Sequence, residues 1–266
     1  MPSKYLEFTK RAFIRSIEYR AEIFLWFLLD LLPFVVLFLV WLSIYTDRST
    51  IQGVSLPQVL QFYFLVVIVS SVTDNHFEEW RVREVREGKI DFFLIRPFSY
   101  ILELLLTHLG DKLLGMSIRA IMLVFAYIAL QAFFPLNLPS VSAPELAIFT
   151  ALLVMAFAIQ TLLGLLIVLA GFWLDNASSL VNFKWLGLAL FGGSLVPLPL
   201  LPGWLRSVVL ALPLKYVFAM PVGVIQRTQV MTGGDWLYLT AFIAGLALVA
   251  RFIWHRALVK YSSAGG

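Results

Sequence analysis

The stretch from Pro144 to Leu174, PELAIFTALLVMAFAIQTLLGLLIVLAGFWL, decides the class of fold. It contains one charged residue, Glu145, and it exceeds the roughly 20 apolar residues that a helix needs to cross about 30 Å of hydrocarbon. A helix of this length spans a bilayer at a tilt or extends into the interface. We therefore predict an integral membrane protein.

The composition of the whole chain supports this prediction. Of its 266 residues, 61% are hydrophobic and only 14% are charged. Soluble domains hold roughly 45–50% apolar and about 25% charged residues, so a soluble enzyme and a disordered chain are excluded. The chain has no cysteine, which excludes a disulfide scaffold and a metal site with cysteine ligands.

Six segments are apolar enough to be membrane spans. They are Ile23–Tyr45, Pro57–Thr73, about Leu113–Phe134, Pro144–Leu174, Ala177–Val196 and Trp236–Trp254. The region 197–226 is also apolar, but proline and glycine interrupt it, which favours short re-entrant or interfacial helices over a regular span. The residues that mark this region are Pro197, Pro199, Pro202, Gly203 and Trp204. We predict an all-α integral membrane protein with a single transmembrane domain over residues 1–266.

Lysine and arginine are distributed unevenly over this predicted topology. Six spans place both termini on one side, and 15 Lys and Arg residues fall there, against 4 on the other side. Cytoplasmic loops carry such an excess, so we expect both termini in the cytoplasm and residues 197–226 outside the cell. The net charge of +4 then reports topology, and no nucleic-acid partner is expected.

The first 22 residues form an amphipathic pattern. At about 100° per residue, Leu6 and Ile17 share one face of a helix, while Arg11 and Arg15 lie on the other face. This pattern predicts a helix in the membrane interface, with its basic face toward anionic lipid headgroups. A simple anchor segment is the alternative.

The densest polar stretch is the loop between the second and third predicted spans, residues 74–112. Its charges alternate in sign from 78 to 87, which predicts a short solvated helix with Gly88 as its C-terminal cap. An apolar run follows at 92–95, and an exposed helix beside an apolar patch favours docking of a soluble partner. The alternative is a loop folded back onto the membrane face.

No catalytic motif is convincing. The pattern Glu78-Glu79-x-x-x-Arg83 also occurs in intramembrane CAAX-type proteases, but these need further histidines on neighbouring spans, and none of the three histidines here has a partner mid-span. H-E-x-x-H, G-x-S-x-G and the phosphate loop G-x-x-x-x-G-K-[ST] are absent. We therefore predict no catalytic residue, no metal site and no ATP hydrolysis by this chain. Active transport would draw on an ion gradient or on a separate ATPase.

Two charged residues lie inside predicted spans, where charges are costly and often functional. Asp30 lies about 10 Å from the cytoplasmic start of the first span, and Arg119 lies at a similar depth in the third. We hypothesise an ion pair between them. The alternative is that the Arg119 side chain extends to the interface. No series of carboxylates marks an ion pathway, which weakens a gradient-driven mechanism.

Several segments, taken in order, are similar to one family. They are the N-terminal helix leading into the first span (Tyr5 to Tyr45), the loop Glu87-Gly88-Lys89-Ile90-Asp91 with the following 94–100, the segment PLPLLPGWL at 197–205, and the chain end at 260–266. Their order and spacing resemble the membrane subunit, or permease, of type-2 ABC exporters (the ABC-2 type transporter permease family). The resemblance covers nearly the whole chain.

This resemblance implies a specific architecture. It implies six transmembrane helices, an interfacial elbow helix at 1–22, a cytoplasmic coupling helix within the loop 74–112, and re-entrant extracellular helices at 197–226. It also implies contacts with an ATPase at Glu78, Glu79, Arg83, Glu84, Glu87, Gly88, Asp91, Arg96 and Pro97.

The resemblance further implies an assembly and a function. Two copies of an ABC ATPase would bind ATP and Mg, while this chain holds no cofactor of its own. A second permease, identical or related, and membrane lipids would be the other partners. The implied function is ATP-driven export of an amphipathic or hydrophobic substrate across the cytoplasmic (inner) membrane. A gradient-driven secondary transporter or a channel is the alternative.

Overall fold

Two of the long helices begin with the same local signal. The computed structural model describes residues 20–91, 99–133, 138–174 and 176–260. The backbone N–H of Ser55 donates to Gln58 Oε1 over 2.8 Å at the start of one helix, and that of Ser142 donates to Glu145 Oε2 over 2.7 Å at the start of another. Each is a capping box with a proline in the first turn, which fixes where the helix starts.

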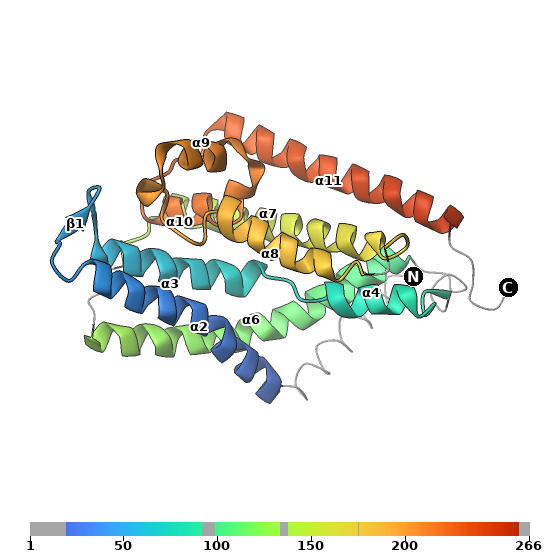
Figure 1. Cartoon of the computed structure of the whole chain (residues 1–266), viewed down its shortest axis with the longest axis horizontal. Coiled ribbons are helices and arrows are strands. Elements are labelled where there is room, and N and C mark those ends of the chain that lie inside the picture. Colours follow the sequence, from blue (N-terminus) through green and yellow to red (C-terminus); the bar gives the residue numbers. More distant parts are fainter. Residues whose placement is uncertain (1–19, 92–98, 134–137, 175, 261–266) are drawn as a thin grey trace.

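Helices dominate the described chain (Figure 1). Among them are α2 (Arg20–Ile44), α3 (Leu56–Thr73), α4 (Glu78–Arg86), α6 (Tyr100–Phe133), α7 (Ala143–Ala170), α8 (Ser179–Phe191) and α11 (Gly233–Lys260). An antiparallel hairpin of two short strands joins α2 to α3, and its strands are β1 (Thr50–Ile51) and β2 (Val54–Ser55). This hairpin lies at one end of the long axis, and α4 lies at the other end.

Three of the six predicted spans coincide with segments of membrane length. Three segments of the described chain are long and apolar enough to cross a membrane, namely Leu56–Arg86, Ala143–Ala170 and Gly233–Val259. Shorter apolar helices occur at Val35–Ile44, Tyr100–Gly110, Met116–Ile128 and Ser179–Phe191. Each of the six predicted spans overlaps a helix, and the number that crosses the membrane stays a prediction.

The clearest differences from the predicted spans are in α6, α8 and α11, and α11 runs past Trp254 to Lys260. α6 begins at Tyr100, before the expected start at Leu113, because no proline interrupts this stretch and Ser99 Oγ accepts from the backbone N–H of Leu102 over 3.4 Å. α8 ends at Phe191 because Gly193 follows with a φ of +80°. The 13 residues of α8 rise about 20 Å, less than the roughly 30 Å of a hydrocarbon core.

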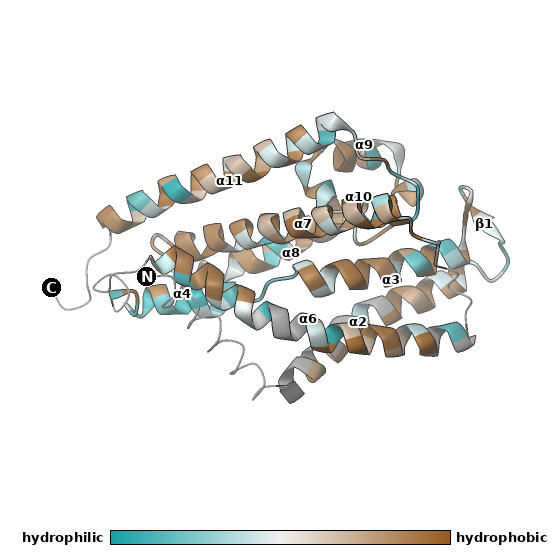
Figure 2. Ribbon diagram, turned by 180° about the vertical axis from the view of Figure 1, so that it is seen from behind, coloured by the Kyte–Doolittle hydropathy of each residue, from teal (hydrophilic) through white to brown (hydrophobic). Residues whose placement is uncertain are grey.

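α7 lies at the centre of the bundle and packs against α3, α4 and α11. Its Leu152, Ile159 and Val168 are completely buried. Large apolar side chains point outward elsewhere, as at Phe125 on α6 and Leu237 on α11. Figure 2 shows hydrophobic residues along the long helices and hydrophilic residues concentrated on α4. Such an apolar exterior fits a lipid environment.

The region 197–226 contains short helices, as predicted. They are η1 (Leu198–Leu200), α9 (Gly203–Ala211), η2 (Pro213–Tyr216) and α10 (Ala219–Ile225). Pro197 and Pro202 stand directly before η1 and α9, and Trp204 is 69% exposed. All residues of α10 are buried, and it packs against α3 and α7. A re-entrant position in the membrane stays a prediction. The predicted interfacial helix falls largely on residues 1–19, outside the described residues.

The buried face of α7 gives a test of this fold. We expect Leu152→Ala to lower the free energy of unfolding by about 2–5 kcal/mol, because it leaves a cavity in the centre of the bundle. The matched control is Leu146→Ala on the same helix, whose side chain is 55% exposed and which should change stability little. Thermal unfolding in detergent measures both. Equal effects of the two changes would contradict the placement of α7.

Candidate functional site

The polar helix α4 follows α3 after a short non-helical linker, residues 74–77. The sequence predicted a solvated helix here, and a helix is present at Glu78–Arg86. Full solvation is wrong, because one face of α4 is buried and this face carries Glu78 and Arg81. Both charged side chains can be buried in the bundle because each forms an ion pair with a side chain of opposite charge.

Glu78 forms a buried ion pair with Lys184. The Lys184 ammonium donates to Glu78 Oε1, and the side chains are only 3% (Lys184) and 0% (Glu78) exposed. Lys184 Nζ also lies 3.4 Å from the Asn75 carbonyl oxygen and 4.3 Å from the centre of the Trp185 ring. Since Lys184 belongs to α8, the pair ties α4 to α8. Glu78 therefore lies inside the bundle, not on the exposed face to which the sequence assigned it.

Arg81 ties α4 to α6. Its Nη2 donates to Glu103 Oε1 over 3.1 Å, and its Nη1 donates to Glu84 Oε2 over 3.0 Å. The guanidinium carbon lies 4.2 Å from the centre of the Trp80 ring. Thr107, one turn further along α6, donates to the same Glu103 oxygen over 2.9 Å. Glu84 is therefore engaged with Arg81 and is only partly available to a partner.

Gly164 lets α4 approach α7 closely. A Cβ atom at this position would lie 2.7 Å from Glu78 Oε1 and 2.9 Å from Phe77 Cζ, closer than real Cβ contacts. The absence of a side chain at Gly164 thus makes room for the buried ion pair of Glu78. α4 is consequently held by three helices: α6, α7 and α8.

The linker between α3 and α4 is held by a second polar network. Asn75 Nδ2 donates to Thr161 Oγ1 of α7 over 3.1 Å, and its Oδ1 lies 2.8 Å from His108 Nε2 of α6. Gln160 Nε2 donates to Asp74 Oδ1 over 3.0 Å. These contacts join the C-terminal end of α3 to α6 and to the C-terminal half of α7. The polar groups of the linker are satisfied by neighbouring helices, as buried polar groups require.

The exposed face of α4 borders a polar groove of about 350 Å³. The start of α8 forms its other wall, and the lining residues are Glu79, Val82, Arg83, Arg86, Ser178, Ser179 and Asn182. Within the part of the chain that the structure describes, neither Arg83 nor Arg86 forms a salt bridge. The groove thus holds the two positive charges of Arg83 and Arg86 against the single negative charge of Glu79, and this excess suits it to acidic side chains.

α4 ends where the sequence predicted it, just before Gly88. Gly88 has a φ of +70°, which confirms the predicted glycine cap, and the backbone N–H of Lys89 donates to the Glu84 carbonyl oxygen over 3.0 Å. Glu87 is exposed, and a hydrogen bond from Lys89 lowers the pKa of the Glu87 carboxyl below its ordinary value. Glu87 is therefore ionised at neutral pH and adds a negative charge to the exposed end of α4.

For several residues, the role assigned from the sequence stays a prediction. Arg96 and Pro97 lie outside the described residues, while Asp91 is half-buried just after α4. The side chain of Asp30 in α2 is outside the described ones, and Arg119 in α6 is half-buried. The hypothesised ion pair between Asp30 and Arg119 stays a hypothesis.

The residues of α6 and α8 that bind α4 could not be identified from the sequence. Lys184 lies within the fifth predicted span, Ala177–Val196, where the sequence assigns it no partner, and Glu103 lies in the predicted loop 74–112, which is helical from Tyr100 onward. Their only signal was their position within apolar helices, where a charge calls for a partner. The identity of each partner came only with the fold.

These features define the class of protein. A multi-pass helical membrane protein carries a charged helix at one end, and that helix is locked to three others. The chain belongs to the ABC-2 transporter family, because the family model described as "ABC-2 family transporter protein" matches residues 31–265. It is therefore the membrane subunit of an ABC transporter, and its family implies an ABC ATPase as partner. No curated protein and no solved structure matched the chain.

The ion pair of Glu78 and Lys184 predicts that loss of either partner lowers the stability of the protein strongly. We expect Lys184→Met to lower the free energy of unfolding by about 3–5 kcal/mol, because it leaves the Glu78 carboxylate buried without a partner. Adding Glu78→Gln to Lys184→Met should recover most of this loss, since the buried charge is then gone. Denaturant unfolding of the two single variants and the double variant measures the coupling. Additive effects would show that the two side chains do not interact.

The close approach at Gly164 predicts a contrast between two glycines. Gly164→Ala should destabilise the protein by about 1–3 kcal/mol, because the new Cβ displaces Glu78 and Phe77. The control is Gly187→Ala in α8, where a Cβ meets nothing within 4 Å and where alanine should stabilise the helix by up to about 1 kcal/mol. Thermal unfolding compares them. A neutral or stabilising Gly164→Ala would contradict the packing of α4 on α7.

Proposed function

We propose that this chain is the permease of an ATP-driven exporter and that α4 is the helix on which the partner ATPase docks. The observation that supports this proposal is the division of α4 into two faces. One face carries the buried pairs of Glu78 and Arg81, and the other carries Glu79, Arg83 and Arg86 in the open. A helix of this kind can bind a soluble partner and pass a displacement to the membrane helices.

The proposed mechanism follows the contacts of α4. ATP and Mg bind to the partner ATPases, which close and push on α4. Because Glu78 is paired with α8, Arg81 with α6, and Gly164 of α7 lies against α4, the displacement reaches all three helices together. α7 in turn packs against α10 at the other end of the bundle. In this way ATP binding switches the transport path between inward-facing and outward-facing.

The proposed assembly has two permeases and two ATPase subunits. The second permease is a second copy of this chain or a related one. The proposed permease crosses the cytoplasmic membrane with six spans. Both termini and α4 then lie in the cytoplasm, while the hairpin and residues 197–226 lie outside the cell. The apolar helix exteriors, together with an aromatic content of 15%, fit an amphipathic or hydrophobic cargo.

Charge reversal on the exposed face of α4 tests this proposal. We expect Arg83→Glu with Arg86→Glu to weaken ATPase assembly at least about tenfold, because like charges then face the acidic groups of the partner. The tagged chain is purified from the cells that produce it, and the bound ATPase and the ATP turnover are both quantified. The control is Arg206→Glu, an exposed arginine of α9 near the opposite end of the bundle.

Three results would speak against the proposal. Purification of the native chain without ATP turnover would favour a gradient-driven transporter or a channel. Unchanged assembly in the α4 double variant would show that the partner docks elsewhere. Equal losses in the α4 variant and in Arg206→Glu would indicate a general effect of added negative charge.

A further inference from the structure

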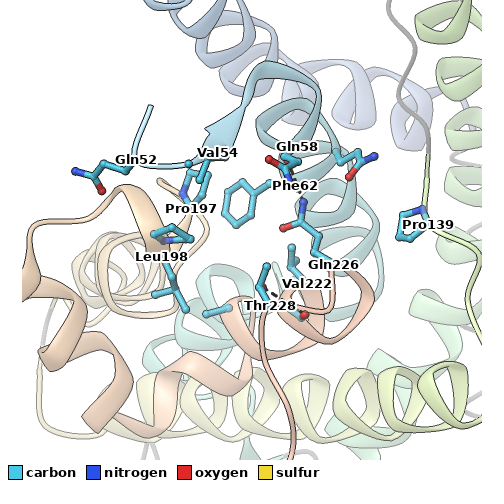
Figure 3. A pocket seen from close by; sticks show the side chains of 15 residues that line it. Gln52, Val54, Gln58, Phe62, Pro139, Pro197, Leu198, Val222, Gln226 and Thr228 are labelled. Carbon is cyan, nitrogen blue, oxygen red and sulfur yellow. Dashed lines mark hydrogen bonds between the residues drawn. The ribbon is translucent and has the colours of Figure 1, made fainter. Parts of the chain in front are cut away.

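A cavity of about 330 Å³ opens at the hairpin end of the bundle, away from α4 (Figure 3). The turn between β1 and β2, the start of α3, η1 and the end of α10 meet around it. Its lining includes Gln52, Gln58, Gln61, Phe62, Pro197 and Gln226. In Figure 3, Gln58 and Gln226 lie near each other on one side, while Pro197 and Leu198 lie on the opposite side.

The lining carries no charged side chain but has four glutamines from three separate segments. Gln226 Nε2 donates to the Gln58 carbonyl oxygen over 3.0 Å, and Gln58 Oε1 accepts from the Ser55 N–H. Among the described residues, nothing occupies Gln226 Oε1 or Gln58 Nε2. Two of the lining amides therefore keep one atom each for a further hydrogen bond, an acceptor on Gln226 and a donor on Gln58.

The backbone around this cavity is held in unusual conformations. Gln52, with a φ of +49°, and Arg227, with a φ of +58°, are the non-glycine residues with positive φ in the described chain. Gln52 lines the cavity, and Arg227 stands between the lining residues Gln226 and Thr228. Such conformations cost energy outside glycine and gather at sites that clamp ligands.

The two positions have different local origins. Gln52 precedes Gly53, with a φ of +78°, in a two-residue hairpin turn where asparagine is the usual choice. Arg227 instead anchors a neighbouring segment, since its Nε donates to Glu145 Oε1 over 2.8 Å and its Nη2 donates to the Ser140 carbonyl oxygen over 2.9 Å. These bonds hold the segment that carries Pro139, another lining residue. The end of α10 and the segment that carries Pro139 are therefore tied to each other without a ligand.

We propose that this cavity binds a neutral, hydroxyl-rich group of the size of a single sugar ring. A hydroxyl both donates and accepts, which matches primary amides that offer both functions. The absence of charged lining leaves a phosphate, a carboxylate or an ammonium group without a counter-charge. Pro197, Leu198 and Phe62 offer apolar surface to the C–H faces of such a ring.

The volume sets the size of the ligand. Ligand pockets measure about 300–1,000 Å³, so this cavity lies at the small end and holds one ring rather than a chain of rings. The proposal does not depend on ATP-driven export, because it rests only on the geometry of this end of the bundle.

Sugar binding to the intact chain tests the proposal. The chain is placed in nanodiscs of phosphatidylcholine and phosphatidylglycerol, without glycoside detergents, whose headgroups would compete. Saturation-transfer difference NMR is recorded with the methyl glycosides of glucose, galactose, mannose and N-acetylglucosamine. Glucuronate and glucose 6-phosphate serve as the charged counterparts. We expect saturable signals from at least one neutral glycoside and none from the charged sugars.

Variants assign the signal to the cavity. Gln226→Leu and Gln52→Leu should each weaken binding at least about fivefold, because each removes a hydrogen-bonding amide. Gln52 is exposed on a turn, so its loss leaves the fold intact. The control, Gln131→Leu in α6, removes the same group outside the cavity. The proposal is overturned if no neutral glycoside binds, if the charged sugars bind equally well, or if Gln131→Leu weakens binding as much as the cavity variants.

Discussion

The buried pairing of Glu78 with Lys184 is the constraint on which this end of the molecule depends. A carboxylate and an ammonium that are almost inaccessible to solvent are stable only next to each other, because either one alone would cost several kcal/mol, roughly 3–5 when a partner is removed. The pair therefore fixes the position of α4 on α8. The missing side chain of Gly164 and the bond from Arg81 to Glu103 follow from the same placement.

This arrangement gives the charged helix two separate roles. Its buried face belongs to the membrane helices, and its exposed face with Arg83 and Arg86 is open to a soluble partner. In the proposed exporter, a displacement of α4 is transmitted to the membrane helices and is not lost in a flexible linker. The linker at 74–77 is itself hydrogen-bonded to α6 and α7. The hairpin end instead has a cavity with no charged lining residue, and residues with positive φ lie in or next to its lining. The two ends thus differ in chemistry along one shared helix, α7.

The sequence predicted those features that depend on local patterns. Apolar length located α2, α3, α7 and α11, alternating charges located α4, and Gly88 marked its end. Features that depend on distant partners could not be read in this way. Glu78 and Lys184 are 106 residues apart, and nothing in either segment names the other. For the same reason a solvated α4 was the natural expectation, and the uncharged cavity of four glutamines appeared only once distant segments met.

In the proposed exporter, the paired charges of Glu78 and Lys184 hold α4 so that movement of the ATPase reaches the membrane helices. The most direct test exchanges the charges, with Glu78→Lys and Lys184→Glu in one chain. ATP turnover of the assembled transporter is then compared with that of the two single-change chains. We expect each single change to abolish coupled ATP turnover and the exchanged pair to restore a large part of it. An exchanged pair as inactive as the single changes would show that the Glu78–Lys184 pair does not couple α4 to the membrane helices.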